Sequence, residues 1–137
     1  MARFLRVVSA ICLSLAVLSA AETLLAQTPA TASEFYMQYR KIFAAAKKIE
    51  DVLPYMSAET KKQVESTPPK ERAEMFEFIK MMNDQTNIKV VKETKTATGA
   101  TLSVTALDSD KKPTTAEVTI VREGNAFKLG KESWTSK

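Results

Sequence analysis

The fold is decided by residues 86–134, which read TNIKVVKETKTATGATLSVTALDSDKKPTTAEVTIVREGNAFKLGKESW. Apolar and polar side chains alternate along this stretch with a period of two, which is the pattern of strands with one buried face. The apolar positions before the last segment are Ile88, Val90, Leu102, Val104, Ala106, Ala116, Val118 and Ile120. All of them are even-numbered, so the pattern predicts three antiparallel strands that share one apolar face.

The last segment carries its apolar residues Phe127 and Leu129 at odd positions. The connection before it must therefore shift the register by one residue. A two-residue turn at Gly124-Asn125 does so, because it pairs Ile120 with Leu129 and puts glycine in the first central position of a type II′ turn. The sequence thus predicts a four-stranded antiparallel meander whose second face meets water.

Trp134 conflicts with this register, because an even position in the last strand should point to the wet face. A β-bulge at Gly130 would resolve the conflict by turning the residues after it inward. We therefore predict that Trp134 is at least half buried.

The N-terminal segment predicts export. Two arginines precede an uncharged stretch, residues 7–21, and small residues follow it, which is typical of a secretory signal peptide. We expect cleavage after Ala21 or Ala26, so that residues 1–26 are the signal peptide and the protein is periplasmic or secreted, with no stable membrane anchor. Cys12, the only cysteine, would be removed with this peptide, and the mature protein would contain neither a disulfide nor a thiol.

The rest of the chain predicts a single α+β domain. A length of 137 residues, with 45% hydrophobic and 26% charged residues, is typical of one globular domain. Residues 27–32 are expected to form a mobile leader and residues 33–137 the domain itself. The formal net charge of +4 is small, and basic residues alternate with acidic ones, so no nucleic-acid partner is expected.

A first helix is expected before the sheet, because apolar residues recur there at i, i+3, i+4 and i+7. Ser33 is its predicted N-cap and Glu34 its first residue, with Lys47 and Lys48 in the last turn, where they complement the helix dipole. Its basic side chains, including Arg40, are expected on a solvated face.

Two further helices follow. One is predicted over residues 58–65 behind the cap Ser57, and the next from Pro68 to Met82 behind the cap Thr67. The apolar arc of the latter covers about 220°, more than a one-sided surface helix needs. Three explanations are open: packing against both the sheet and a neighbouring helix, a pocket lined by Met and Phe, and a dimer face. The residues of this arc are Met75, Phe76, Phe78, Ile79, Met81 and Met82.

Three helices followed by a four-stranded meander are similar to the cone-shaped domain of the nuclear transport factor two-like superfamily. Residues 53–59, LPYMSAE, resemble a segment of its small secreted bacterial members that ends in Tyr-Leu-Ser-x-Glu, and residues 124–129, GNAFKL, resemble a turn followed by an aromatic residue, Lys and an aliphatic residue. Phe127 stands where those relatives usually have Trp. The resemblance implies a long helix lying in a curved sheet with a cavity between them, and it implies fold more than function.

The sequence contains no constellation that dictates a reaction. Histidine is absent, which excludes triads that depend on it and removes the commonest transition-metal ligand. Three glycines are too few for a phosphate-binding loop. We therefore expect no catalytic residue, no metal and no cofactor.

These observations favour a non-enzymatic periplasmic or secreted domain that binds a small apolar ligand or a protein partner, as a monomer or a homodimer. Tyr39, Phe43, Phe78 and Met82 are the expected cavity lining, because the helical pattern places them on inner faces. The alternative is a histidine-free isomerase or hydratase that acts on a small apolar molecule in the cone. Enzymes of the superfamily use an acidic or histidine base, and the strand pattern picks out no inward carboxylate.

Overall fold

The computed structural model describes residues 28–136, so the predicted signal peptide lies outside the described residues. The helices of this part of the chain are α1 (Ala32–Ala45), the 3-10 helices η1 (Ile49–Asp51) and η2 (Leu53–Tyr55), α2 (Ala58–Glu65) and α3 (Pro69–Met82). The strands are β1 (Thr86–Lys95), β2 (Gly99–Leu107), β3 (Pro113–Glu123) and β4 (Ala126–Ser136). None of the described helices is long and apolar enough to cross a membrane.

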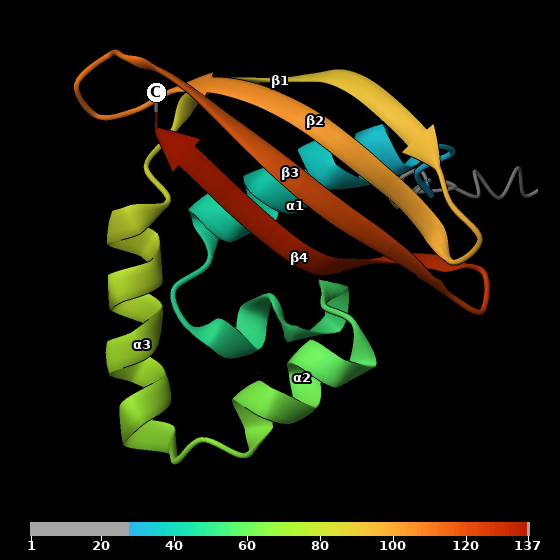
Figure 1. Ribbon diagram of the computed structural model, residues 1–137. Coiled ribbons are helices and arrows are strands. Elements are labelled where there is room, and N and C mark those ends of the chain that lie inside the picture. The colour runs from blue at the N-terminus through green and yellow to red at the C-terminus, as the bar shows by residue number, and fades with distance from the viewer. Residues whose placement is uncertain (1–27, 137) are drawn as a thin grey trace, which may run out of the picture.

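The four strands form one antiparallel sheet in the order β1-β2-β3-β4, which confirms the predicted meander (Figure 1). Strands β3 and β4 pair Ile120 with Leu129 across the two-residue turn Gly124-Asn125. Gly124 has a φ of 61°, whereas Asn125 does not have a positive φ. This combination fits the predicted type II′ turn.

Strand β4 contains the expected bulge. Thr119 pairs with Lys131 and Ile120 with Leu129, so Gly130 is the extra residue between them. The register after the bulge places Trp134 opposite Ala116, and its indole is partly buried against the core. The prediction for Trp134 is confirmed.

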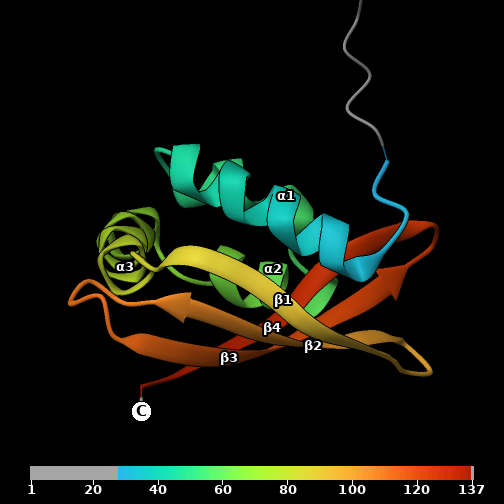
Figure 2. The ribbon, with the colours of Figure 1, turned by 90° about the horizontal axis from the view of Figure 1, so that it is seen from above.

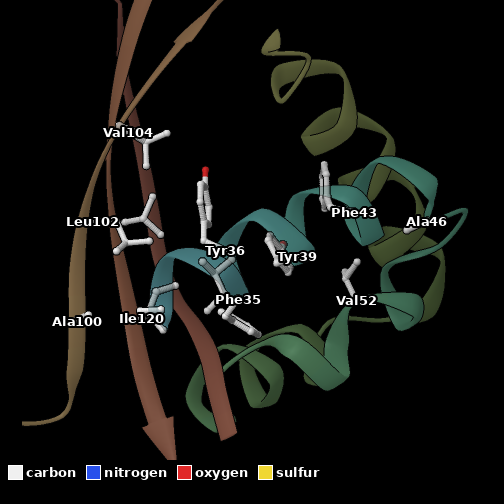
Figure 3. Packing of buried hydrophobic residues seen from close by; sticks show 14 of the residues in the cluster. Phe35, Tyr36, Tyr39, Phe43, Ala46, Val52, Ala100, Leu102, Val104 and Ile120 are labelled. Carbon is white, nitrogen blue, oxygen red and sulfur yellow. The ribbon is translucent and has the colours of Figure 1, made fainter. Parts of the chain in front are cut away.

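Helix α1 lies across one face of the curved sheet, and the described helices leave the opposite face uncovered (Figure 2). The core lies between α1 and the sheet, where aromatic side chains of the helix meet aliphatic ones of the strands (Figure 3). Its fully buried members include Tyr36, Leu102, Val118 and Ile120. Burying each such side chain contributes about 1.5–3 kcal/mol before the entropy of ordering is subtracted.

The first helix begins two residues earlier than predicted. The N-cap is Thr31, whose hydroxyl oxygen accepts a hydrogen bond of 3.1 Å from the backbone N–H of Glu34, so the prediction of Ser33 as cap is wrong. The stretch from Thr31 to Glu34 reads Thr-x-x-Glu, the capping-box spacing, and the Glu34 carboxylate accepts from the N–H of Ala30 at 2.8 Å. The Thr31 cap bond and the Ala30–Glu34 bond together fix the start of the helix at Ala32.

The same helix also ends earlier, at Ala45, so Lys47 and Lys48 do not lie in its last turn. Their backbone N–H groups instead donate to the Asp51 carboxylate at 3.0 and 3.2 Å, which fixes the start of η1. These hydrogen bonds, first that from Lys47, hold the pKa of Asp51 below its ordinary value.

The second predicted helix is confirmed with its bounds and its Ser57 cap, whereas the third begins one residue late. Pro68 is the N-cap of α3 and Pro69 its first residue. A proline disfavours helical geometry in the residue before it. Pro68 accordingly has an extended ψ of 145°, and the helix cannot start there.

Candidate functional site

The structure divides the four predicted cavity residues into two pairs. Tyr39 and Phe43 of α1 are buried, as expected, but Phe78 and Met82 of α3 are 58% and 57% exposed. Helix α3 turns Phe76 toward the core instead, and side chains two and six positions further along an α-helix point elsewhere. The placement of Phe78 and Met82 on an inner face is therefore wrong.

Aromatic rings occupy the space between α1 and its neighbours. The ring centroids of Phe35 and Tyr39 are 6.5 Å apart, those of Tyr39 and Phe43 are 6.1 Å apart, and those of Phe43 and Phe76 are 5.8 Å apart. Pairs at such distances stabilise a core beyond the area they bury. The row of rings packs α1 against both the strands and α3.

A buried ion pair lies beside this row. The Arg40 guanidinium is 2.8 Å from the Glu132 carboxylate, and the two side chains are only 8% and 11% exposed. Trp134 donates a hydrogen bond to the same carboxylate oxygen, and the guanidinium carbon lies 5.7 Å from the centroid of the indole ring. Arg40 also donates to the side chains of Asn83 and Gln85. The expectation that Arg40 is solvated is wrong.

The pattern of the sequence contained a signal for both members of this pair. Arg40 follows Tyr36 by four residues and precedes Phe43 by three, so it shares the buried face of α1. Glu132 shares a strand face with Trp134, and the bulge at Gly130 that turns the indole inward turns the carboxylate inward as well. The sequence-based expectation placed Arg40 on a solvated face because of its charge and picked out no inward carboxylate on the strands.

A second inward carboxylate comes from a bulge in β1. The register shifts between Val90 and Lys92, which leaves Val91 as the extra residue and places Glu93 opposite the buried Leu102. The Glu93 carboxylate accepts hydrogen bonds from the hydroxyl and the backbone N–H of Ser33, the latter at 3.0 Å. A negative charge at the first turn of a helix is stabilising, so Glu93 anchors α1 to the sheet edge.

Tyr36 brings a phenol into the interior beside Glu132. Its buried hydroxyl lies close enough to the Glu132 carboxylate for both the charge and hydrogen bonding of that group to act on it, although no hydrogen bond of good geometry joins the two groups. Burial, and then the charge of Glu132, raise the pKa of Tyr36 far above its ordinary value. Burial likewise raises the pKa of Tyr39, so both phenols stay neutral.

The Glu132 carboxylate of this cluster has structural partners. One of its oxygens accepts hydrogen bonds from Arg40 and Trp134, and neither Glu132 nor Tyr36 lines the two pockets described below. A general base needs to lie within hydrogen-bond reach of the proton that it takes. The arrangement joins α1 to β4 and gives the isomerase or hydratase alternative no support.

The most enclosed apolar pocket lies between α1, η2 and the β3–β4 turn, with a volume of about 220 Å³. Lys128 is the single charged side chain among the described residues that line it. Its apolar walls are formed by Phe35, Tyr39, Ile42, Tyr55 and Phe127. Of the predicted cavity residues, only Tyr39 belongs to this pocket.

A larger hollow, of about 1090 Å³, lies between the start of α1 and β1. Charged side chains from both elements, Glu34, Lys41 and Lys89, contribute to its lining. Small-molecule sites are enclosed and mostly apolar, with few polar groups, so the smaller pocket is the better candidate.

No group of acidic side chains among residues 28–136 could hold a metal ion. In comparisons with known proteins, no family model matches the chain, and neither the curated proteins nor the solved structures contain a significant match.

Proposed function

We propose that this protein is a non-enzymatic domain that binds a small apolar ligand in the pocket between α1, η2 and the β3–β4 turn. The proposal includes the two expectations that rest on sequence: export to the periplasm or the outside by a cleaved signal peptide, and membership of the nuclear transport factor two-like superfamily. The order of three helices and a four-stranded meander is compatible with that superfamily.

The observation that carries the proposal is the composition of the pocket wall. Phe35, Tyr39 and Phe127 present rings to it, while Ile42 and Tyr55 complete the apolar lining. A dry cavity of about 150 Å³ accepts benzene, so a pocket of this size accepts a ligand of about ten nonhydrogen atoms.

Naphthalene has that size and no polar group, which makes it a suitable probe. We expect saturable binding, detected by NMR as shifts of amide signals from the pocket residues. Ala126 lies at the exposed start of β4 and lines the pocket, so Ala126→Trp should fill it and weaken binding at least about tenfold.

Val91→Trp is the matched control, because Val91 is also an exposed strand residue and lies outside this pocket. It should leave the affinity unchanged. Absence of saturable binding to the unmodified protein, or equal affinity of Ala126→Trp, would refute the proposal.

One observation favours a second candidate function, self-association through α3. Phe78, Met81 and Met82 are all more than half exposed, and Phe76 is the only buried residue of this helix. Contiguous exposed apolar side chains mark interaction surfaces. Because Phe78 and Met82 are exposed and not packed in the core, their exposure supports the dimer face among the three explanations for the wide apolar arc.

The charges around this surface indicate a second copy of the chain as the partner. Glu74 and Glu77 are exposed on α3, and the exposed Lys47 and Lys48 line the same hollow as these two carboxylates. This side of the domain carries both signs of charge, so two copies that meet here about a two-fold axis can pair acidic with basic side chains. Sedimentation velocity should then show a dimer that dissociates on dilution, and Glu74→Lys/Glu77→Lys should weaken it. A strictly monomeric species at micromolar concentration would exclude this function.

A further inference from the structure

The pocket between α1, η2 and the β3–β4 turn contains a positive charge that no carboxylate of its lining balances. We infer that its ligand is an anion, a small aromatic or aliphatic acid whose carboxylate pairs with Lys128. This inference rests on the proposed function, because it specifies what the pocket selects.

The ammonium group of Lys128 is held in place by the protein. Its Nζ donates a hydrogen bond to the carbonyl oxygen of Pro54, and Pro54 also lines the pocket. An ammonium group has three N–H donors, so two remain for a ligand. Within residues 28–136, Lys128 forms no ion pair, and its side chain is partly withdrawn from solvent. Partial burial strengthens the attraction between this charge and an anion.

A second cation lies against the pocket wall. The guanidinium carbon of Arg122 is 4.7 Å from the centroid of the Phe127 ring, and this ring lines the pocket. A cation at this distance is held by the ring quadrupole. Arg122, like Lys128, forms no ion pair with another described residue.

The nearest acidic side chain in sequence is already engaged. The Glu123 carboxylate accepts a hydrogen bond of 2.6 Å from the backbone N–H of Ala58, at the first turn of α2. No aspartate or glutamate is among the described residues that line the pocket. The electrostatic field there favours an anion over a neutral molecule and disfavours a cation.

The apolar wall limits which anions fit. A bare phosphate or acetate would leave the apolar wall of the pocket uncovered, whereas an aryl or branched alkyl group covers it. The class of ligand that can both cover the apolar wall and pair with Lys128 is therefore a monocarboxylic acid with an apolar body of about ten nonhydrogen atoms.

Three probes of one shape test this inference: cinnamate, cinnamyl alcohol and cinnamylamine. Isothermal titration should rank them with cinnamate tightest, at least about tenfold tighter than the alcohol, as expected for a charge-assisted hydrogen bond. The amine should be weakest. The preference for cinnamate should fall as salt is added.

Substitutions of Lys128 test whether this side chain causes the preference for cinnamate over cinnamyl alcohol. Lys128→Met should bring the affinities for cinnamate and cinnamyl alcohol together, and Lys128→Arg, which keeps the charge, should restore the difference. Lys131→Met is the matched control, because Lys131 is an exposed lysine of the same strand outside this pocket, and it should leave the preference intact.

The outcomes separate the two proposals. If cinnamyl alcohol binds as tightly as cinnamate, or if Lys128→Met keeps the preference, the ligand is not selected by charge and the inference is wrong while apolar binding stands. If none of the three probes nor naphthalene binds, the proposed function fails, and this inference fails with it.

Discussion

Arg40 and Glu132 form an ion pair of 2.8 Å between α1 and β4, although 92 residues of sequence separate them. Neither side chain has solvent to stabilise its charge if the other is removed, because both are almost fully buried. The Trp134 indole donates to the same Glu132 oxygen, so the pair joins α1 to the part of β4 that follows the bulge at Gly130. A charged contact thus links the main helix to the sheet beside an otherwise largely apolar core.

Removing one partner of this ion pair should lower the free energy of unfolding far more than replacing both partners with apolar side chains. Glu132→Ala leaves the guanidinium buried and uncompensated, and we expect the free energy of unfolding to fall by about 3–5 kcal/mol. Arg40→Met/Glu132→Leu should cost clearly less than the sum of the single changes, because apolar side chains of similar size replace the charges. Urea unfolding of the unmodified protein, Arg40→Met, Glu132→Leu and the double variant measures the difference.

The exposed pair Lys61 and Glu65 is the control for this cycle. Glu65→Ala should change the free energy of unfolding by no more than about 0.5 kcal/mol, since solvent screens that pair. If the costs of the Arg40 and Glu132 changes simply add, the buried pair is not the coupled unit described.

The sheet could be predicted because the sequence pattern that specifies it lies within each strand and its neighbouring turn. Alternation along each strand set the faces, and the odd positions of Phe127 and Leu129 required a two-residue turn that the structure contains. Trp134 identified the bulge at Gly130, since an indole on a wet face is unfavourable. Glu132 follows from the same bulge by parity, but which cation would meet it depends on how α1 crosses the sheet.

The outer part of α3 was not predictable in the same way. Periodicity shows that its apolar arc is wide, yet it does not say which part of the arc faces the domain. The structure turns Phe76 to the core and leaves Phe78 and Met82 outside. The prediction placed Phe78 and Met82 on an inner face for this reason. The pocket wall instead contains residues of η2 and of the β3–β4 turn. Those contributions come from contacts distant in sequence.

Tyr36 should make the protein sensitive to alkali. Burial raises the pKa of its phenol in the folded state, so above the ordinary value of 10.0 the unfolded chain loses a proton that the folded protein keeps. This stability is present below pH 10.0 and is lost as the pH rises, at about 1.4 kcal/mol per pH unit for one phenol. Tyr36→Phe should change the stability little at pH 7, because no hydrogen bond of good geometry to the hydroxyl is lost, and it should flatten the alkaline decline.

Thermal unfolding of both proteins between pH 7 and pH 11 tests this expectation. Tyr39→Phe should flatten the decline as well, because burial raises the pKa of Tyr39 in the same direction. An identical alkaline decline in Tyr36→Phe would show that its phenol ionises as readily in the folded protein as in the unfolded chain.

Asp51 should make the stability of the protein depend on pH in the opposite direction, with stability lost as the solution becomes acidic. Hydrogen bonds from the backbone N–H groups of Lys47 and Lys48 lower its pKa in the folded state below 3.8. Its contribution is therefore complete above pH 3.8 and is lost as the pH falls through the lower, folded value. Asp51→Asn should lower the melting temperature at pH 7, and the difference should shrink at pH 2–3. Asp84→Asn, at an exposed aspartate, is the control and should show no such convergence.

Gly99 should be the least replaceable glycine of the sheet. A Cβ atom on Gly99 would run into the backbone carbonyl of Ile120 in β3, and backbone cannot yield without disturbing the β2–β3 pairing. Gly99→Ala is therefore expected to cost about 3 kcal/mol, the upper end of the range for overpacking. Gly124→Ala meets no atom within 4 Å, and its cost of about 1–2 kcal/mol comes from the φ of 61° alone. Urea unfolding of the two variants should rank Gly99→Ala as the less stable. The reverse order would mean that β2 and β3 separate locally at Ile120 without loss of the sheet, and that the turn at Gly124 is the stricter constraint on the meander.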